Sequence, residues 1–249
     1  PQLLAHSRVE FDAPLHRGLL SLNHKNDNEL EAAQVLSNEL ARCYANATTQ
    51  LLQSANLTPR DISAIGCHGQ TVRHRPDLGF SLQLNNPSLL AELTHISVVA
   101  DFRARDVAAG GQGAPLVPAF HAAVFGDKKI HRAVVNIGGI SNLTDLPVDG
   151  SISGFDCGPG NVLMDAWIRQ HHGVAFDRDG IWALGGNVHS SLLQKMLAEK
   201  YFSLPPPKST GRDLFNLPWL LPFLDNDMLP QDVQTTLLAL TAQTIVDAI

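Results

Sequence analysis

Apolar residues recur every three or four positions along several stretches of the chain, and they alternate or run together along shorter ones. The first pattern predicts helices at 28–54, 87–93, 119–125, 162–171, 188–200, 212–224 and 231–249. The second pattern predicts strands at 62–67, 80–84, 96–100, 133–137, 141–146 and 151–155. Helices and strands therefore share the chain, which predicts an α/β fold.

Three asparagines stand where these helices are expected to begin. Asn28 precedes Glu31 at the spacing of a capping box, and Asn86 precedes Pro87 as an N-cap precedes a first-turn proline. Asn161 is expected to cap the helix at 162–171. Between the strand at 96–100 and the helix at 119–125, residues 101–118 are expected to form a long loop, and loops of that length usually have a function.

The length fits either one large α/β domain or two lobes. With 249 residues, of which 44% are hydrophobic and 17% are charged, the chain can bury a large core. Single cores stop growing at about 250–300 residues, so this length allows both, and we favour two lobes. The polar turn at 126–129 is the predicted boundary, which assigns 1–129 to a first lobe and 130–249 to a second.

Charge and cysteine usage exclude several classes of protein. A net charge of −6 supplies no basic field for nucleic acid, and no apolar run is long enough to predict a membrane span. Three scattered cysteines predict neither a disulfide framework nor a zinc cage and favour a reducing compartment, the cytoplasm. The histidines and serines show no spacing typical of a metalloprotease or of a serine hydrolase.

Two glycine-rich segments follow predicted strands and are candidates for phosphate binding. Glycine lets backbone approach a ligand closely, and successive N–H groups at a turn or helix start can hold an anion. Residues 136–142 read Asn-Ile-Gly-Gly-Ile-Ser-Asn, which also fits an ordinary hairpin. In residues 154–161, Asp156 stands between small neighbours at the expected end of a strand, where it should face an open cleft. The alternative is an ordinary aspartate in a turn. A kinase needs such a carboxylate to accept the proton of the nucleophile.

Two further segments contain side chains that could bind a polar ligand. Arg103 and Arg105 alternate with aspartates in a loop that continues through Gly113, and guanidinium groups bind carboxylates at two points. A solvated charge run is the alternative interpretation. His68, Gly69 and Gln70 follow another strand and could bond sugar hydroxyls, although a structural histidine fits this position equally well.

These segments together resemble a known family. The strings at 64–71, from 99–102 to 117–120, at 136–142, at 154–167 and at 207–212 are similar to those of anhydro-N-acetylmuramic acid kinases. The resemblance runs from about residue 29 to the last residue. It implies a two-lobed fold of the actin, Hsp70 and hexokinase type with ATP and Mg²⁺ between the lobes. In this family water opens the 1,6-anhydro bond of the sugar, and the released O6 takes the γ-phosphate to give N-acetylmuramic acid 6-phosphate, a step of peptidoglycan recycling.

The resemblance also implies roles for individual residues. Asp156 would be the base that activates the water. The nucleotide phosphates would lie at Asn136, Gly138, Gly139, Ser141, Asn142, Gly158 and Gly160. The sugar would lie near His68, Gly69, Gln70, Arg103, Arg105 and Gly113. For Lys208 to Arg212 packing is the expected role, and a homodimer is the expected assembly.

The chain departs from the family pattern in one respect that bears on activity. The family's opening Gly-Thr-Ser-x-Asp-Gly string and its further C-terminal glycine-rich segment do not occur here, so sequence is expected to be missing at both ends. A catalytically inactive remnant that still holds the sugar is therefore an alternative to the kinase. A generic actin-like nucleotide-binding protein is a third hypothesis, but it leaves the sugar-facing segments without a role.

Overall fold

The computed structural model describes residues 2–23, 25, 27–150, 152–225 and 227–249. The chain forms two compact units, a first unit that ends at Gly113 and a second unit that begins at Ala114. This division comes earlier than the predicted lobe boundary at 129/130, because helix α5 (Pro118–Phe125) packs on strands of the second unit. The division into two functional lobes stays a prediction.

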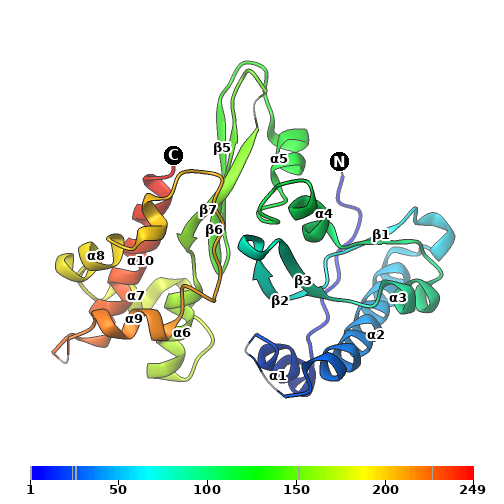
Figure 1. Ribbon diagram of the computed structural model, residues 1–249, viewed down its shortest axis with the longest axis horizontal. Helices are drawn as coiled ribbons and strands as arrows, with labels where there is room; N and C mark the ends of the chain where they lie inside the picture. Colours follow the sequence, from blue (N-terminus) through cyan, green and yellow to red (C-terminus); the bar gives the residue numbers. More distant parts are fainter. Residues whose placement is uncertain (1, 24, 26, 151, 226) are drawn as a thin grey trace. The chain divides into compact units, whose positions relative to one another are not determined.

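The first unit is built around one long helix. Its elements are α1 (Ala13–Ser21), α2 (Glu29–Ala55), β1 (Ile65–Cys67), β2 (Gln70–Arg75), β3 (Phe80–Leu84), α3 (Pro87–Thr94), β4 (Val98–Ala100) and α4 (Phe102–Ala108), with short 3-10 turns at Pro59–Asp61 and Pro76–Leu78. Strands β1 and β4 pair in parallel, whereas β2 and β3 form an antiparallel hairpin (Figure 1). The apolar face of α2 packs against α1, the hairpin and α3, and Leu40 and Leu90 are fully buried there.

The sequence predicted α2, β1, β3, α3 and β4 but not α1 or β2, and two local predictions were wrong. Helix α2 is confirmed, and Asn86 caps α3 as expected, because its side-chain oxygen accepts a bond from the Leu89 N–H at 3.0 Å. Asn28 forms no capping box: its backbone is left-handed, and its amide donates to the Glu31 carboxylate instead. The expected loop at 101–118 contains helix α4.

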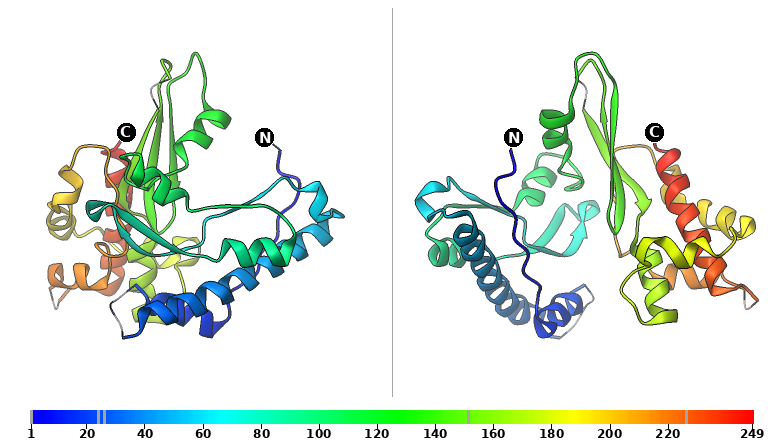
Figure 2. Two further views of the ribbon diagram at one scale, coloured as in Figure 1. Left: turned by 45° about the vertical axis from the view of Figure 1, so that its right-hand side comes forward. Right: turned by 180° about the vertical axis from the view of Figure 1, so that it is seen from behind.

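The second unit is a three-stranded antiparallel sheet covered by helices. Strands β5 (Arg132–Ile137), β6 (Ile140–Leu146) and β7 (Ser153–Pro159) pair in that order. The helices are α5, α6 (Val162–His172), α7 (Ile181–Leu184), α8 (Ser190–Leu197), α9 (Leu217–Leu220) and α10 (Pro230–Val246), with 3-10 turns at Arg178–Gly180, Lys200–Ser203 and Leu221–Phe223. Figures 1 and 2 show α5 and α10 on opposite sides of this sheet.

Side chains on the two faces of the sheet contact these two helices. Leu143, Phe155 and Cys157 form a buried cluster against Ile245 of α10. On the other face, the buried Thr144 hydroxyl bonds His121 of α5 at 2.9 Å. The largest core of the unit lies among the helices and includes Leu163, Leu192, Met196, Phe215, Leu220, Leu237 and Leu240.

Strand β7 differs from its predicted extent in a way that affects the site. It was expected at 151–155 but extends to Pro159, so Asp156 lies inside the strand rather than at its end. Ser151 lies outside the described residues. Asn161 stands before α6 but makes no side-chain cap bond, and the helix predicted at 212–224 is reduced to α9 and the 3-10 turn that follows it.

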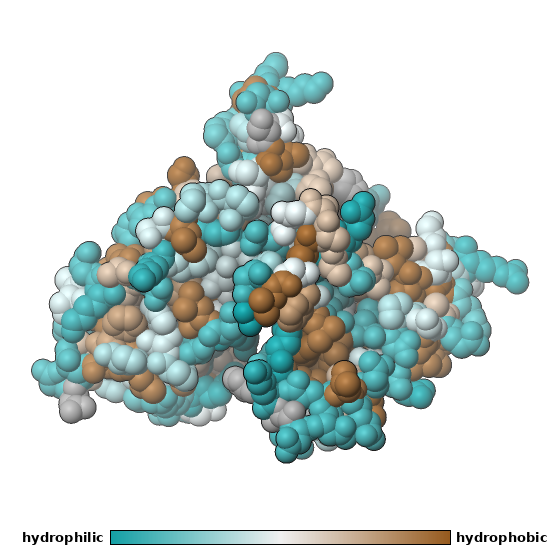
Figure 3. Space-filling model, in the orientation of Figure 1, coloured by the Kyte–Doolittle hydropathy of each residue, from teal (hydrophilic) through white to brown (hydrophobic). Residues whose placement is uncertain are grey.

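Both units contain helices and small sheets, so the predicted α/β class is confirmed at this level. On the face drawn in Figure 3, hydrophobic residues lie among hydrophilic ones. Within the described ranges, no helix has the length and apolar character that a membrane crossing requires.

Candidate active site

Two glycine turns of the second unit are joined by backbone hydrogen bonds. The Gly160 and Val162 N–H groups donate to the Gly139 carbonyl at 2.9 and 3.1 Å, and the Asn161 N–H donates to the Gly138 carbonyl at 2.7 Å. A Cβ on Gly160 would lie 2.2 Å from the Gly138 oxygen, so only glycine fits there. The β5–β6 turn and the start of α6 therefore form one structural piece.

This arrangement changes the expected mode of phosphate binding. The three N–H groups at the start of α6 already bond carbonyls, so they are not available as an anion cradle. Ser141 is fully buried, and its hydroxyl donates to the Gly158 carbonyl at 3.1 Å, which makes both residues part of the framework. Asn136 is exposed beside the turn.

Arg212 lies beside the same turn and adds a positive charge to it. A Cβ on Gly139 would lie 3.8 Å from Arg212 Nη2. The charge of Arg212 also acts on Asp165 of α6, whose pKa is nevertheless raised because burial outweighs the attraction of Arg169 and Arg212. Asn136, Gly138, Gly139 and Arg212 are thus the accessible groups of this turn.

Asp156 is buried in β7, and only 5% of its surface is exposed. One carboxylate oxygen, Oδ2, accepts a hydrogen bond from the Thr210 N–H at 3.0 Å. Its backbone is fixed as well, because its N–H donates to the Lys208 carbonyl at 3.1 Å and its carbonyl accepts from the Tyr201 hydroxyl at 2.8 Å. The open cleft expected around Asp156 is thus not found in this unit, where the carboxylate is enclosed by residues 208–210.

A one-residue irregularity follows Asp156 in the strand. Asn142 pairs with Asp156 and Ser141 pairs with Gly158, so Cys157 has no partner in the ladder. Such bulges re-aim neighbouring side chains and are common beside active sites. Asn142 and Asp156 stand directly opposite each other and therefore point to the same face of the sheet.

Burial shapes the acid–base properties around Asp156. Burial raises the pKa of the Cys157 thiol to about 11, and the negative charge of Asp156 adds to this shift. The same two causes, burial first, raise the pKa of Tyr201 far above its usual value. Burial also lowers the pKa of Lys208, whose ammonium donates to the Phe202 and Tyr201 carbonyls at 3.0 and 3.3 Å. Cys157 and Tyr201 therefore keep their protons at neutral pH, and Lys208 holds the Tyr201 and Phe202 carbonyls.

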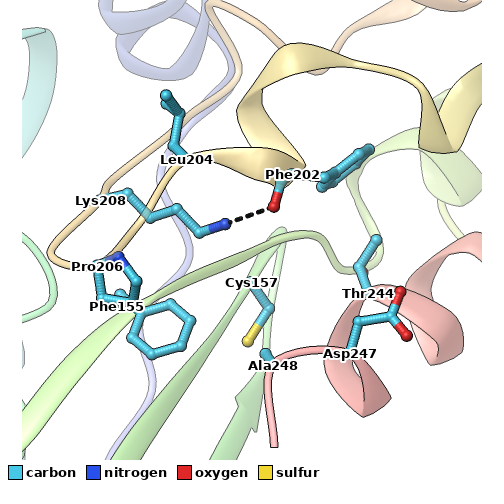
Figure 4. Close-up of a pocket in the computed structure, with 9 residues that line it drawn as sticks. All are labelled: Phe155, Cys157, Phe202, Leu204, Pro206, Lys208, Thr244, Asp247 and Ala248. Atoms are coloured by element: carbon cyan, nitrogen blue, oxygen red, sulfur yellow. Dashed lines mark hydrogen bonds between the residues drawn. The ribbon is translucent and has the colours of Figure 1, made fainter.

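A cavity of about 270 Å³ lies between β7, α10 and the segment that leads to Lys208. Figure 4 shows Phe155, Cys157, Lys208 and Asp247 around it, with the Lys208 ammonium bonded to the Phe202 carbonyl. Phe155 and Asp156 are successive residues of β7, and successive side chains of a strand point to opposite faces. The cavity is therefore separate from the carboxylate.

In the first unit, the structure brings four of the predicted sugar-facing residues together. Arg103 Nε donates to His68 Nε2 at 2.9 Å, and Arg103 Nη1 donates to the Gly113 carbonyl at 2.6 Å. The other ring nitrogen of His68, Nδ1, is 2.7 Å from the Gly69 carbonyl. Asp106 completes the cluster by accepting from the Gly113 N–H at 2.7 Å.

Two predicted residues do not join this cluster. Gln70 begins β2 and pairs with Leu84 of β3, and Arg105 is exposed on α4. No interaction of the Arg105 side chain is found within the described part of the chain. Across that same part, no three His, Cys, Asp or Glu side chains gather closely enough to hold a metal ion.

Sequence reasoning missed Asp106 and Tyr201, and it expected only a packing role for the segment at 208–212. The similarity at 207–212 pointed to this segment, but its role depends on contacts 54 residues away in sequence, such as that between Thr210 and Asp156. For Asp106 the available signal was its place in the Arg-Asp run, which drew attention only to the arginines.

Comparison with known proteins gives one consistent result. The family model of anhydro-N-acetylmuramic acid kinase matches residues 1–249. An anhydro-N-acetylmuramic acid kinase of Nitrosomonas europaea is 55% identical over 243 residues, which are 97% of this chain and 67% of that protein. Those of Bordetella pertussis and Pseudomonas syringae are 56% and 52% identical over the whole chain, which covers 67% and 69% of their lengths. The chain spans about two thirds of the length of these relatives.

Proposed function

The chain belongs to the anhydro-N-acetylmuramic acid kinase family, and we propose that the protein carrying it opens 1,6-anhydro-N-acetylmuramic acid with water and phosphorylates it from ATP. Relatives that carry this name and are more than 50% identical to the chain support this kinase function. They give no separate support to a binding-only remnant or to a generic nucleotide-binding protein.

In the proposed reaction, Asp156 is the general base. A water oxygen attacks the anomeric carbon and its proton passes to Asp156, while the bond from that carbon to O6 breaks. The released O6 attacks the γ-phosphorus, and the bond to the β–γ bridging oxygen breaks to leave ADP. The observation that supports this role is a carboxylate fixed inside β7 by the Thr210 N–H, in the unit that also carries the joined glycine turns.

The burial of Asp156 places a strict demand on this mechanism. Because only 5% of the residue is exposed, the attacking water has to occupy a small, defined position beside the carboxylate. A base held in one orientation gains from such confinement, since a positioned proton acceptor needs no reorganisation during the reaction.

Nucleotide binding is assigned to the turn around Gly138 and Gly139, with Asn136 and Arg212 beside it. Arginine suits this position because its guanidinium binds phosphate oxygens at two points. Magnesium would enter with the nucleotide, since Mg²⁺ in such sites is held largely by phosphate oxygens and water. The sugar is assigned to the His68, Arg103 and Gly113 cluster. A two-lobed actin-like arrangement, a cytoplasmic location and a homodimer complete the proposal.

Substitution of Asp156 by asparagine tests the assignment. In the protein that carries this chain, Asp156→Asn is expected to lower kcat by roughly 10²–10⁴ while sugar affinity stays the same, because the amide cannot accept the proton. ADP release and the phosphorylated sugar would be measured, with sugar binding followed by calorimetry. Asp225→Asn is the matched control, since that carboxylate is 63% exposed and pairs with Lys195 at 3.6 Å. A variant with unchanged kcat would show that Asp156 is not the base.

A further inference from the structure

Two buried polar atoms next to Asp156 lack a hydrogen-bond partner. They are the Asn142 side-chain oxygen Oδ1 and the Thr210 hydroxyl Oγ1, and no partner for either occurs within the described part of the chain. Buried polar atoms are nearly always bonded, and unbonded ones call for an explanation such as a water molecule or a ligand. Here two of them flank one carboxylate.

Both atoms belong to residues that are tied to Asp156. Asn142 is its direct partner in the β6–β7 ladder, and directly opposite residues have Cβ atoms about 4.5–5.5 Å apart. Thr210 bonds Asp156 Oδ2 through its N–H at 3.0 Å, and its hydroxyl is only three covalent bonds from that nitrogen. These two contacts place the Asn142 and Thr210 side chains beside Asp156, on the face of the sheet to which its carboxylate points.

The chemistry of these groups selects their occupant. The carboxylate and the amide oxygen only accept hydrogen bonds, so a shared partner has to donate two. A phosphate group carries negative charge and is repelled by the Asp156 carboxylate, and a substrate hydroxyl has a single proton to donate. A water molecule donates twice, and buried waters typically make about three bonds.

We propose that Asp156, Asn142 and Thr210 together hold the water that attacks the sugar. The water donates one proton to Asp156 and the other to Asn142 Oδ1, and it accepts a bond from the Thr210 hydroxyl. Its second lone pair is left free, which is the electron pair that forms the bond to the anomeric carbon. The inference rests on the proposed function and adds Asn142 and Thr210 to it as positioning residues. In this assignment Asn142 serves the water rather than the nucleotide.

Thr210→Val is the decisive variant because it removes the hydroxyl and keeps both the shape and the backbone N–H that bonds Asp156. It is expected to lower kcat by roughly 10- to 100-fold with KM for the sugar within about twofold, since the water is lost and the sugar contacts are not. Thr210→Ser restores the hydroxyl and is expected to recover kcat to within about threefold. Thr48→Val is the control, because the Thr48 hydroxyl donates within α2, to the Tyr44 carbonyl at 2.9 Å, in the first unit.

A double variant separates shared positioning from general damage. Asn142→Ala is expected to lower kcat as well. Each single variant loses the same water, so the fold-loss in kcat of the double variant Asn142→Ala, Thr210→Val should be clearly smaller than the product of the two single fold-losses. Fully multiplicative losses would contradict a shared water. A merely structural role would lower stability in step with activity and would not be rescued by serine.

A high-resolution crystal structure of the wild type tests the proposal without any turnover. An ordered water within about 3.2 Å of the three named atoms, absent from Thr210→Val, is the expected result. A wild-type site with no such water, or a valine variant with normal kcat, overturns the inference. If Asp156→Asn kept its rate while the water was present, the base assignment would fail and the water site would stand.

Discussion

Gly160→Ala tests whether the two glycine turns form one structural piece. The added Cβ would lie 2.2 Å from the Gly138 carbonyl oxygen and 3.3 Å from the Ser141 nitrogen. Both are backbone atoms, which cannot move aside as a flexible side chain can. The start of α6 has to separate from the β5–β6 turn, which breaks the bonds at 2.9, 2.7 and 3.1 Å that join them. At about 1 kcal/mol for each bond, unfolding should become easier by roughly 2–3 kcal/mol.

Urea unfolding followed by tryptophan fluorescence measures this change in the right place. All three tryptophans, Trp167, Trp182 and Trp219, belong to the second unit. Gly138→Ala is the matched control from the same turn, because its Cβ would meet nothing closer than 3.7 Å and should cost no more than about 0.5 kcal/mol. The reasoning is refuted if the two variants unfold at the same urea concentration, or if Gly160→Ala stays within about 0.5 kcal/mol of the wild type.

Two further predictions concern pH and the first unit. Folding raises the pKa of the Cys157 thiol from 9.0 to about 11, so the unfolded chain loses this proton first as pH rises. The free energy of unfolding should therefore fall between about pH 9 and about pH 11. Urea unfolding at several pH values should show a smaller fall for Cys157→Ala than for the wild type. Arg103→Gln breaks the hydrogen bonds to His68 and to the Gly113 carbonyl, so thermolysin should cleave this variant near Gly113 roughly threefold faster or more. The control variant Arg105→Gln should be cleaved at the wild-type rate. Equal cleavage rates for the two variants would contradict the proposed role of Arg103.

Helices and strands with a strong local signal could be predicted from the sequence. The apolar spacing over 28–54 and the Asn86-Pro87 pair each determine their element without help from distant residues. The hairpin of β2 and β3 could be predicted only in half, since β2 carries polar residues such as Arg73 and His74 on a partly buried strand. Arg73 is tolerated there because it bonds Glu29 at 3.0 Å and the Leu22 carbonyl, contacts that no local pattern reveals.

The candidate site follows the same division. Asp156 and the glycine turns could be recognised because their residue types are unusual at those positions and match a family. The predicted anion cradle at the start of α6 and the predicted exposure of Asp156 depend instead on what packs around them. The N–H groups of the expected cradle bond the carbonyls of Gly138 and Gly139, and the segment from Lys208 to Thr210 covers the Asp156 carboxylate. Neither contact is visible from the sequence of one segment alone.

The contact between Thr210 and Asp156 explains why side-chain type alone could not assign a role to residues 208–212. Asp156 is fixed by two peptide groups, the Thr210 N–H and the Lys208 carbonyl, which any residue could supply. Two side chains of the segment make other contacts: the Lys208 ammonium bonds the Tyr201 and Phe202 carbonyls, and Arg212 lies beside Gly139. The Thr210 hydroxyl is the exception, because burial without a partner has a cost that packing does not offset. A segment that contacts both Asp156 and the glycine turn, with a buried hydroxyl that has no partner among the described residues, fits the proposed catalytic role better than packing alone.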